Sequence, residues 1–320
     1  MSTSKHNPLR IVFMGTPDFA VGSLEQLIKA DFNVVGVVTA PDRPAGRGRK
    51  VQESAVKQCA TKHNLKVLQP TNLKDKAFLE ELKSLDANLQ VVVAFRMLPK
   101  AVWQMPEHGT FNLHASLLPQ YRGAAPINWA IINGETETGV TTFFIDEKID
   151  TGSVILQKTT SILPDDNVGT LHDRLMELGS HLVVETCKQI EAGTVKRQKQ
   201  DESAALKPAP KIHKETCRID WEASMEDIYN HIRGLSPYPG AWTELVNGDK
   251  AEAMKIFTTE MEQADHNYEI GKLIAEKKSL KVAVQNGYIS LLELQLPGKR
   301  RMQFNEVLNG LNLENKAHLR

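Results

Sequence analysis

The sequence contains little cysteine: three residues in 320, at Cys59, Cys187 and Cys217, with no C-x-x-C pair. Such an odd, widely spaced set argues against a disulfide framework and a cysteine zinc site, and it favours a reducing, cytoplasmic location. No run of 18 apolar residues is present, so we expect no membrane span. The 39 basic and 39 acidic residues cancel, so any nucleic-acid binding must come from local patches.

Two cofactor signatures are also missing. The first apolar run ends at Gly15, but the other glycines of a dinucleotide-binding G-x-G-x-x-G are absent, and Pro17 lacks the N–H that would bind phosphate. A Walker A motif is absent as well. None of the ten histidines has a partner at zinc-binding spacing, so we expect no metal and assign His63 to a surface or capping role.

Short apolar runs alternate with amphipathic stretches in the first half of the chain. The β-branched run at 33–39 suits a parallel strand covered by helices on both faces. The series predicts an α/β fold with a doubly wound, mostly parallel sheet. Ligands bind at the carboxyl ends of such strands, so the loops after Phe95, Asn112 and Asp146 should converge. The expected strands lie at 10–14, 33–39, 66–68, 89–95, 110–114 and 139–146, and the expected helices at 18–30, 54–63, 74–85 and 167–190.

The composition changes near residue 193, where hydrophobic periodicity is lost and basic residues become frequent. We therefore predict one domain at 1–192, a basic linker at 193–212 and a second domain at 213–320. After a helix at 224–234, the second domain contains several short runs of alternating hydrophobicity. These runs predict a small antiparallel β-barrel or sandwich.

The segment 111–152 concentrates polar side chains that suit catalysis. Asn112 and His114 are two residues apart in an expected strand, so they face the same side, and Asp150 follows in a later loop. The three suit direct attack by an amine on a carbonyl carbon. Asn112 and a protonated His114 would donate to the oxygen that becomes negative, which is worth about 3 to 4 kcal/mol per donor. Asp150 would keep His114 cationic and help to move the proton that the amine loses.

Each of these signals is weak when taken alone. An isolated N-x-H pattern has little specificity, and Asp150 followed by Thr-Gly is equally typical of a plain turn. Ser116 lies two residues after His114 but has no separate base to activate it as a nucleophile. The interpretation therefore depends on the neighbouring sequence.

That neighbouring sequence resembles a known family. The stretch HASLLPQYRGAAP at 114–126, with IDTG at 149–152, is similar to the formyltransferases that use formyl-tetrahydrofolate, and within them to the enzymes that act on methionyl-tRNA. Further matching segments are GTPDFA, VVTAPDRPAGRG, VVVAF, RIDW and PYPGAW, so the resemblance covers nearly the whole chain. It implies that Asn112, His114 and Asp150 are the catalytic trio and that the second domain is an OB-like β-barrel that binds tRNA.

The resemblance also implies the two substrates, 10-formyltetrahydrofolate and initiator methionyl-tRNA. One loop departs from the family pattern: Phe95 is followed by Arg96 and Met97, where a glycine and an extra aliphatic residue are common. Arg96 serves equally well to cover apolar surface. The residues expected to contact folate are Phe95, Arg96, Met97, Leu98, Ser116, Leu117, Leu118, Pro119 and Asp146.

A second local feature is the basic segment 41–50, which carries four basic residues and one acidic residue. A solvated surface loop would explain it, but the segment matches the family's insertion that contacts the tRNA acceptor stem, and arginines suit phosphate and base contacts. The resemblance and the basic linker give the expected tRNA contacts Arg43, Arg47, Arg49, Lys50, Lys207 and Lys211. We expect a monomer.

Two alternatives stay open on the sequence. A formyltransferase that acts on a sugar-nucleotide amine would share the trio and the folate pocket but would have no use for the basic segment. A non-catalytic RNA-binding relative would keep the scaffold, although it would gain nothing from retaining Asn112, His114 and Asp150 together. Formylation assays on charged tRNA and on amino sugars distinguish these possibilities.

Overall fold

The computed structural model describes residues 8–45, 50–203 and 205–320. The chain forms two compact units, and each unit contains segments that are distant in sequence. The first unit comprises Met1–Gly123, Thr138–Thr160 and His172–Pro208, and the second comprises Ala124–Glu137, Ser161–Leu171 and Ala209–Arg320. Among the helices of the described residues, none combines the length and apolar character that a membrane crossing requires.

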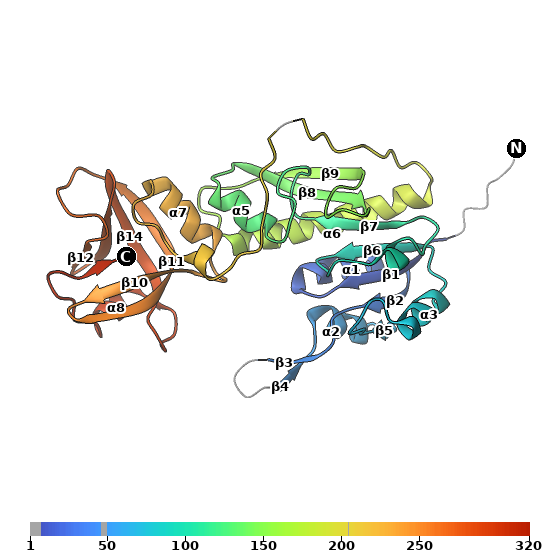
Figure 1. The fold of residues 1–320 in the computed structure, drawn as a ribbon, viewed down its shortest axis with the longest axis horizontal. Coiled ribbons are helices and arrows are strands. Elements are labelled where there is room, and N and C mark those ends of the chain that lie inside the picture. The colour runs from blue at the N-terminus through green and yellow to red at the C-terminus, as the bar shows by residue number, and fades with distance from the viewer. Residues whose placement is uncertain (1–7, 46–49, 204) are drawn as a thin grey trace, which may run out of the picture. The chain divides into compact units, whose positions relative to one another are not determined.

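The first unit is built on a seven-stranded sheet in the order β5-β2-β1-β6-β7-β8-β9 (Figure 1). The pairs from β5 to β7 are parallel, whereas β8 runs antiparallel to β7. The predicted mostly parallel sheet is thus confirmed. The strands are β1 (Arg10–Gly15), β2 (Asn33–Val38), β5 (Val67–Leu68), β6 (Leu89–Val93), β7 (Thr110–His114), β8 (Glu137–Phe144) and β9 (Val154–Ser161).

Helices pack on both faces of this sheet, as a doubly wound fold requires. Val12 and Val92 share one buried cluster with Phe78 of α3 and Val102 of α4. On the other side, α1 packs on α6, where a Cβ added at Gly22 would lie 3.1 Å from Met176. The one-turn helix α4 was not predicted from the sequence. The helices are α1 (Asp18–Lys29), α2 (Ala55–Lys62), α3 (Lys76–Ser84), α4 (Lys100–Trp103) and α6 (Val168–Glu191), which continues into the second unit.

The basic segment begins and ends in a short antiparallel hairpin, β3 (Arg43–Ala45) and β4 (Lys50–Gln52). The segment follows β2, so it leaves the carboxyl end of a parallel strand. Its base is fixed by polar contacts: Asp42 accepts from Lys57 at 2.5 Å and from Gln69 at 2.7 Å. The hydrogen bond and charge of Lys57 hold the pKa of Asp42 below its ordinary value.

The second unit contains an antiparallel sheet in the order β12-β13-β14-β11-β10-β16, with β15 paired to β14. The amide of Leu273, at the start of β12, donates to the carbonyl of Ala317, and the amide of Leu319 in β16 donates to the carbonyl of Gly271. The two edges of the sheet, β12 and β16, therefore meet and nearly close a barrel. This confirms the predicted β-barrel. Its strands are β10 (Ala241–Asn247), β11 (Lys250–Gln263), β12 (Leu273–Glu276), β13 (Ser279–Val284), β14 (Gly287–Gln295), β15 (Met302–Gln303) and β16 (His318–Leu319).

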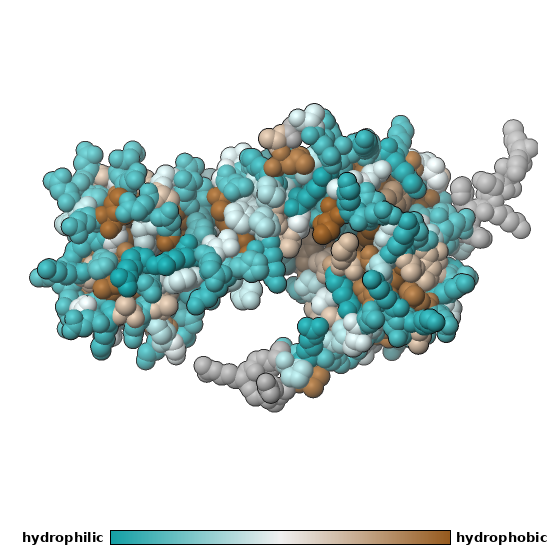
Figure 2. All heavy atoms as spheres, in the orientation of Figure 1, coloured by the Kyte–Doolittle hydropathy of each residue, from teal (hydrophilic) through white to brown (hydrophobic). Residues whose placement is uncertain are grey.

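The barrel interior is apolar, with Ile256, Val282 and Leu294 fully buried. On the face that Figure 2 shows, hydrophilic side chains cover most of this unit. Short helices complete it: α5 (Pro126–Ile132), a 3-10 turn at Glu215–Cys217, α7 (Met225–Gly234) and α8 (Phe304–Leu308).

The segment that composition marks as a linker follows the first unit closely as far as Pro208. Gln198 forms an antiparallel bridge with Val154 through two backbone hydrogen bonds of 2.8 and 2.9 Å. Further along, the carbonyl of Lys207 accepts from the amide of Tyr121 at 2.7 Å. The domain boundaries at 192 and 212 stay predictions.

Candidate active site

Asn112 and His114 lie at the carboxyl end of β7, beside the end of β6. Strand alternation places both side chains on the same face. The carboxamide of Asn112 is half-buried and forms no side-chain hydrogen bond with any residue of the described ranges. The strand therefore presents an amide whose donors are available to a ligand.

His114 is 6% exposed, and its two ring nitrogens have different environments. Nε2 lies 2.8 Å from the backbone carbonyl of Tyr121. Because a carbonyl only accepts, Nε2 carries a proton in both charge states of the ring. Nδ1 faces the carboxylate of Asp150, with 3.9 Å between Nδ1 and Oδ2. This distance is too long for a hydrogen bond but short enough for charge pairing.

Asp150 reaches His114 by a different route from the one predicted. Because β8 is antiparallel to β7, the loop after β8 does not start at the carboxyl edge of the parallel strands. The prediction that this loop reaches the site from a shared carboxyl edge was therefore wrong, although the side chains of Asp150 and His114 do lie close together. Asp150 has a positive φ of 57°, and its Oδ2 accepts from the amide of Gly123 at 2.9 Å. Gly123 itself has φ 128°, a conformation that favours glycine.

Gln200 holds the Asp150 loop from the other side, and the sequence analysis missed it. Its Nε2 donates to the carbonyls of Asp150 at 2.8 Å and Gly152 at 2.9 Å. Its Oε1 accepts two hydrogen bonds from Arg122, which also pairs with Glu202 at 2.8 Å. Gln200 is 6% exposed. It lies in the segment predicted as linker, where composition gave no reason to expect a buried, fully bonded side chain.

The loop after β6 carries four of the residues predicted to contact folate. Met97 is 70% exposed, Phe95 is half-buried and Leu98 is buried. The guanidinium of Arg96 donates to the carbonyls of Pro70 and Thr71 and lies 5.5 Å from the centre of the Phe95 ring. Desolvation lowers the pKa of Arg96, and the positive charge of Arg43 adds to this shift. The Arg96 side chain thus binds the backbone at 70–71.

The other residues predicted to contact folate occupy two places. Ser116 is buried and donates to the carbonyl of Gln120 at 2.6 Å, so its hydroxyl is engaged within the protein. Leu118 is buried, and Leu117 and Pro119 are half-buried. Asp146 is exposed, accepts from the Thr151 hydroxyl at 2.8 Å and lines a hollow of about 580 Å³ with Arg122, Glu147, Lys148, Thr151 and Glu202.

The residues predicted to bind tRNA are placed only in part. Arg43 is exposed on β3, and Lys50 begins β4. Arg47 and Arg49 lie outside the described residues. Lys207 and Lys211 are both exposed, the first in the first unit and the second in the second unit.

Comparison with known proteins identifies the family. The model of the family described as "Formyl transferase" matches residues 9–187, and that of "Formyl transferase, C-terminal domain" matches residues 211–312. The chain belongs to the formyl transferase family. It is 60% identical to the methionyl-tRNA formyltransferase of Flavobacterium johnsoniae over 97% of this chain and 98% of that relative. It is 57% identical to the enzyme of the same name from Bacteroides thetaiotaomicron, with the same coverage.

Solved structures share the fold of this formyl transferase. An N-formyltransferase from Helicobacter canadensis, in complex with folinic acid and dTDP-3-aminofucose, covers 90% of this chain and 99% of its own, with a TM-score of 0.63 and 21% identity. HypX from Aquifex aeolicus covers 96% of this chain and 49% of its own, with a TM-score of 0.65 and 18% identity. At these identities the likeness shows the fold.

Proposed function

We propose that this formyl transferase moves the formyl group of 10-formyltetrahydrofolate to the α-amine of methionyl initiator tRNA, with Asn112, His114 and Asp150 around the reacting carbon. The observation that carries the proposal is the meeting of Nδ1 of His114 with Oδ2 of Asp150 at the end of β7. The curated relatives at 57–60% identity, which act on methionyl-tRNA by name, favour this acceptor over an amino sugar.

Asn112 and His114 stabilise the oxygen of the transferred group. When the amine attacks, negative charge develops on that oxygen, and preformed donors lower the barrier most when they are shielded from water. Asn112 supplies an amide with no other partner in the described ranges. His114 supplies Nδ1–H, because the Tyr121 carbonyl already occupies Nε2. The imidazole therefore acts through one nitrogen.

Asp150 stabilises the protonated form of His114 and takes part in proton transfer. Its carboxylate is 14% exposed and accepts from the Gly123 amide through the same oxygen that faces His114. During transfer the amine nitrogen bonds to the formyl carbon and loses a proton, while the nitrogen that leaves that carbon gains one. Asp150 is the carboxylate closest to His114 in this arrangement and is suited to pass that proton.

The loop after β6 is suited to form part of the folate site. Phe95 and Met97 offer half-buried and exposed apolar surface next to β7, because Val93 at the end of β6 pairs with Leu113. When bound, the folate supplies the activated formyl group. The hairpin of β3 and β4 leaves the carboxyl end of β2 in the same sheet, and Arg43 on it is exposed for contact with tRNA phosphates.

The direct test is a formyl-transfer assay with purified protein and 10-formyltetrahydrofolate. We expect formylmethionyl-tRNA from charged initiator tRNA and much slower transfer to charged elongator methionine tRNA. An amino-sugar nucleotide serves as the competing acceptor. Transfer to the amino sugar without transfer to the tRNA would overturn the assigned acceptor, and no folate-dependent transfer to either would overturn the enzymatic proposal.

A further inference from the structure

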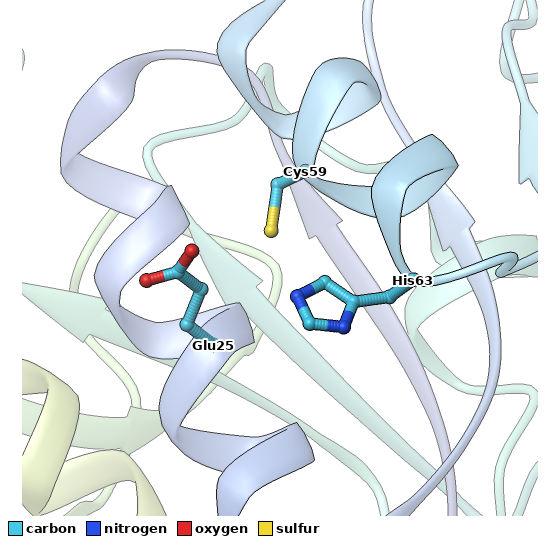
Figure 3. Close-up of side chains that lie close together, drawn as sticks. All are labelled: Glu25, Cys59 and His63. Atoms are coloured by element: carbon cyan, nitrogen blue, oxygen red, sulfur yellow. The ribbon is translucent and has the colours of Figure 1, made fainter.

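Glu25, Cys59 and His63 form a cluster that the proposed reaction does not use. Their ligand atoms (a carboxylate oxygen, Sγ and an imidazole nitrogen) all lie within 4.8 Å of one another. Figure 3 shows Glu25 on one helix and Cys59 and His63 on the neighbouring one, with the three side chains directed toward a common point. None of the three forms a side-chain hydrogen bond or ion pair within the described residues.

Helix packing explains why these side chains meet. Cys59 lies on α2 and His63 caps its C-terminal end, so a spacing of four residues puts both on one face. Glu25 lies on α1, which packs against α2. Leu24 and Leu27 are fully buried, which leaves Glu25 at the edge of the α1 contact face. The cluster was not predicted from the sequence because its third ligand comes from another helix.

Burial gives the cluster one protected side and one open side. Cys59 is 7% exposed, His63 is half-buried and Glu25 is exposed. A bound ion would therefore be shielded by the protein on the thiol side, and water would complete its coordination on the other. Glu25 is free to adjust, because its long exposed side chain has no other partner in the described ranges.

The ligand chemistry selects a metal of intermediate softness. Thiolate, imidazole and carboxylate are the three protein ligands that Zn²⁺ uses, and a thiolate disfavours Mg²⁺ and Ca²⁺. Tetrahedral zinc needs its ligand atoms about 3.3–3.7 Å apart, given bond lengths of about 2.0–2.3 Å, so the cluster must contract by about 1 Å. One thiolate and one carboxylate balance the charge of the ion, and the thiol proton passes to solvent on binding.

We propose that Glu25, Cys59 and His63 bind one Zn²⁺ ion, with water as the fourth ligand, and that this ion ties α2 to α1. The link matters beyond the cluster because α2 also carries Lys57. That side chain pairs with Asp42 at 2.5 Å and with Glu53 at 2.9 Å, on either side of the basic hairpin. A zinc ion at one end of α2 would thus stabilise the helix that anchors this hairpin.

The test uses the whole protein, freed of metal with a chelator and titrated with Co²⁺ as a spectroscopic substitute for Zn²⁺. We expect a thiolate-to-cobalt charge-transfer band and the strong visible bands of tetrahedral Co²⁺, which saturate at one ion per chain and disappear when one equivalent of Zn²⁺ is added. Cys59→Ser should abolish the charge-transfer band. His63→Gln and Glu25→Gln, at partly or fully exposed positions, should each weaken Co²⁺ binding by at least about 10-fold.

Matched controls separate the site from adventitious binding. Cys217→Ser removes a thiol and His181→Gln an exposed imidazole that lie outside the cluster, and both should leave the titration unchanged. Zn²⁺ should raise the melting temperature of the wild type and of these two controls but not of Cys59→Ser. A band that survives Cys59→Ser, equal affinity in the His63 and Glu25 variants, or no band in the wild type would overturn the proposal.

Discussion

A buried hydroxyl of the second unit and the candidate catalytic side chains of the first unit use their polar atoms in opposite ways. In the second unit, the hydroxyl of Thr243 accepts from Nε1 of Trp221 at 2.9 Å and donates to the carbonyl of Arg320 at 3.0 Å, so this buried group is fully bonded within the protein. In the first unit, Nδ1 of His114 lies 3.9 Å from its nearest carboxylate, and Asn112 has no side-chain partner in the described ranges. Thr243 thus supports the fold, whereas Asn112 and Nδ1 of His114 are available to a ligand.

The largest expected effect is the loss of the trio. His114→Ala and Asp150→Ala should each lower the turnover number at least about 10²-fold, because they remove an oxyanion donor and its charged partner. Asp150→Asn is the more specific variant, because it keeps a group that can accept from Gly123 but removes the charge. Its turnover number should fall nearly as far. Steady-state assays at saturating substrates measure the effect, with the exposed His181→Gln as control. Near-normal turnover in both alanine variants would remove the trio from the mechanism.

The corresponding change in the second unit should affect stability and leave chemistry intact. Thr243→Val leaves the buried indole N–H of Trp221 without its acceptor, which should lower the free energy of unfolding by about 1–3 kcal/mol. Urea denaturation measures this. Thr258→Val, at an exposed position on β11, should change stability by less than about 0.5 kcal/mol. If Thr243→Val instead lowered turnover in the folded protein, the contrast between Thr243 and the trio would not hold.

Gln200 should behave as a positioning residue of the first unit. Gln200→Ala removes the two donors that hold the backbone of the Asp150 loop, so we expect turnover to fall about 10-fold while KM for the folate changes little. Gln198→Ala is the matched control, because Gln198 bonds Val154 through its backbone only. Equal kinetics in the two variants would assign Gln200 to stability alone.

The smallest effect is expected at the hairpin. Replacing Arg43 and Arg47 with alanine should raise KM for charged tRNA a few-fold and flatten its salt dependence, since each lost phosphate contact reduces the slope by about one. Turnover at saturating tRNA should not change. Lys76→Ala with Lys83→Ala removes the same charge from exposed positions on α3 and should be neutral. If KM and its salt dependence changed equally in both double variants, the hairpin would contribute only through the overall charge of the protein.

Much of the architecture follows from local patterns. The β-branched run in β2 and the apolar run in β6 lie in the parallel part of the sheet, where β6 is buried throughout and β2 along most of its length. The alternation in β10 and β14 indicates strands with one apolar face, and these strands form the barrel. Asn112 and His114 lie on a predicted strand, and their alternation along it is a local property.

The features that the sequence did not predict depend on contacts between segments that are distant in the chain. The position of Asp150 depends on hydrogen bonds from Gly123 and Gln200, which come from other loops. The cluster of Glu25, Cys59 and His63 depends on how two helices pack. The spacing of Cys59 and His63 is local, but Glu25 comes from another helix, and the partners of Asp150 come from other loops, so no single stretch of sequence reveals either arrangement.

The hydrogen bond between Nε2 of His114 and the Tyr121 carbonyl has a spectroscopic consequence. Because the carbonyl only accepts, this contact requires an N–H at Nε2, and Nδ1 is the ring nitrogen that faces the site. In a sample labelled with ¹⁵N at histidine, the Nδ1 resonance should therefore respond more strongly than the Nε2 resonance when a ligand enters the site. Comparing this resonance without substrate and with each substrate in turn would show which of them changes the surroundings of Nδ1.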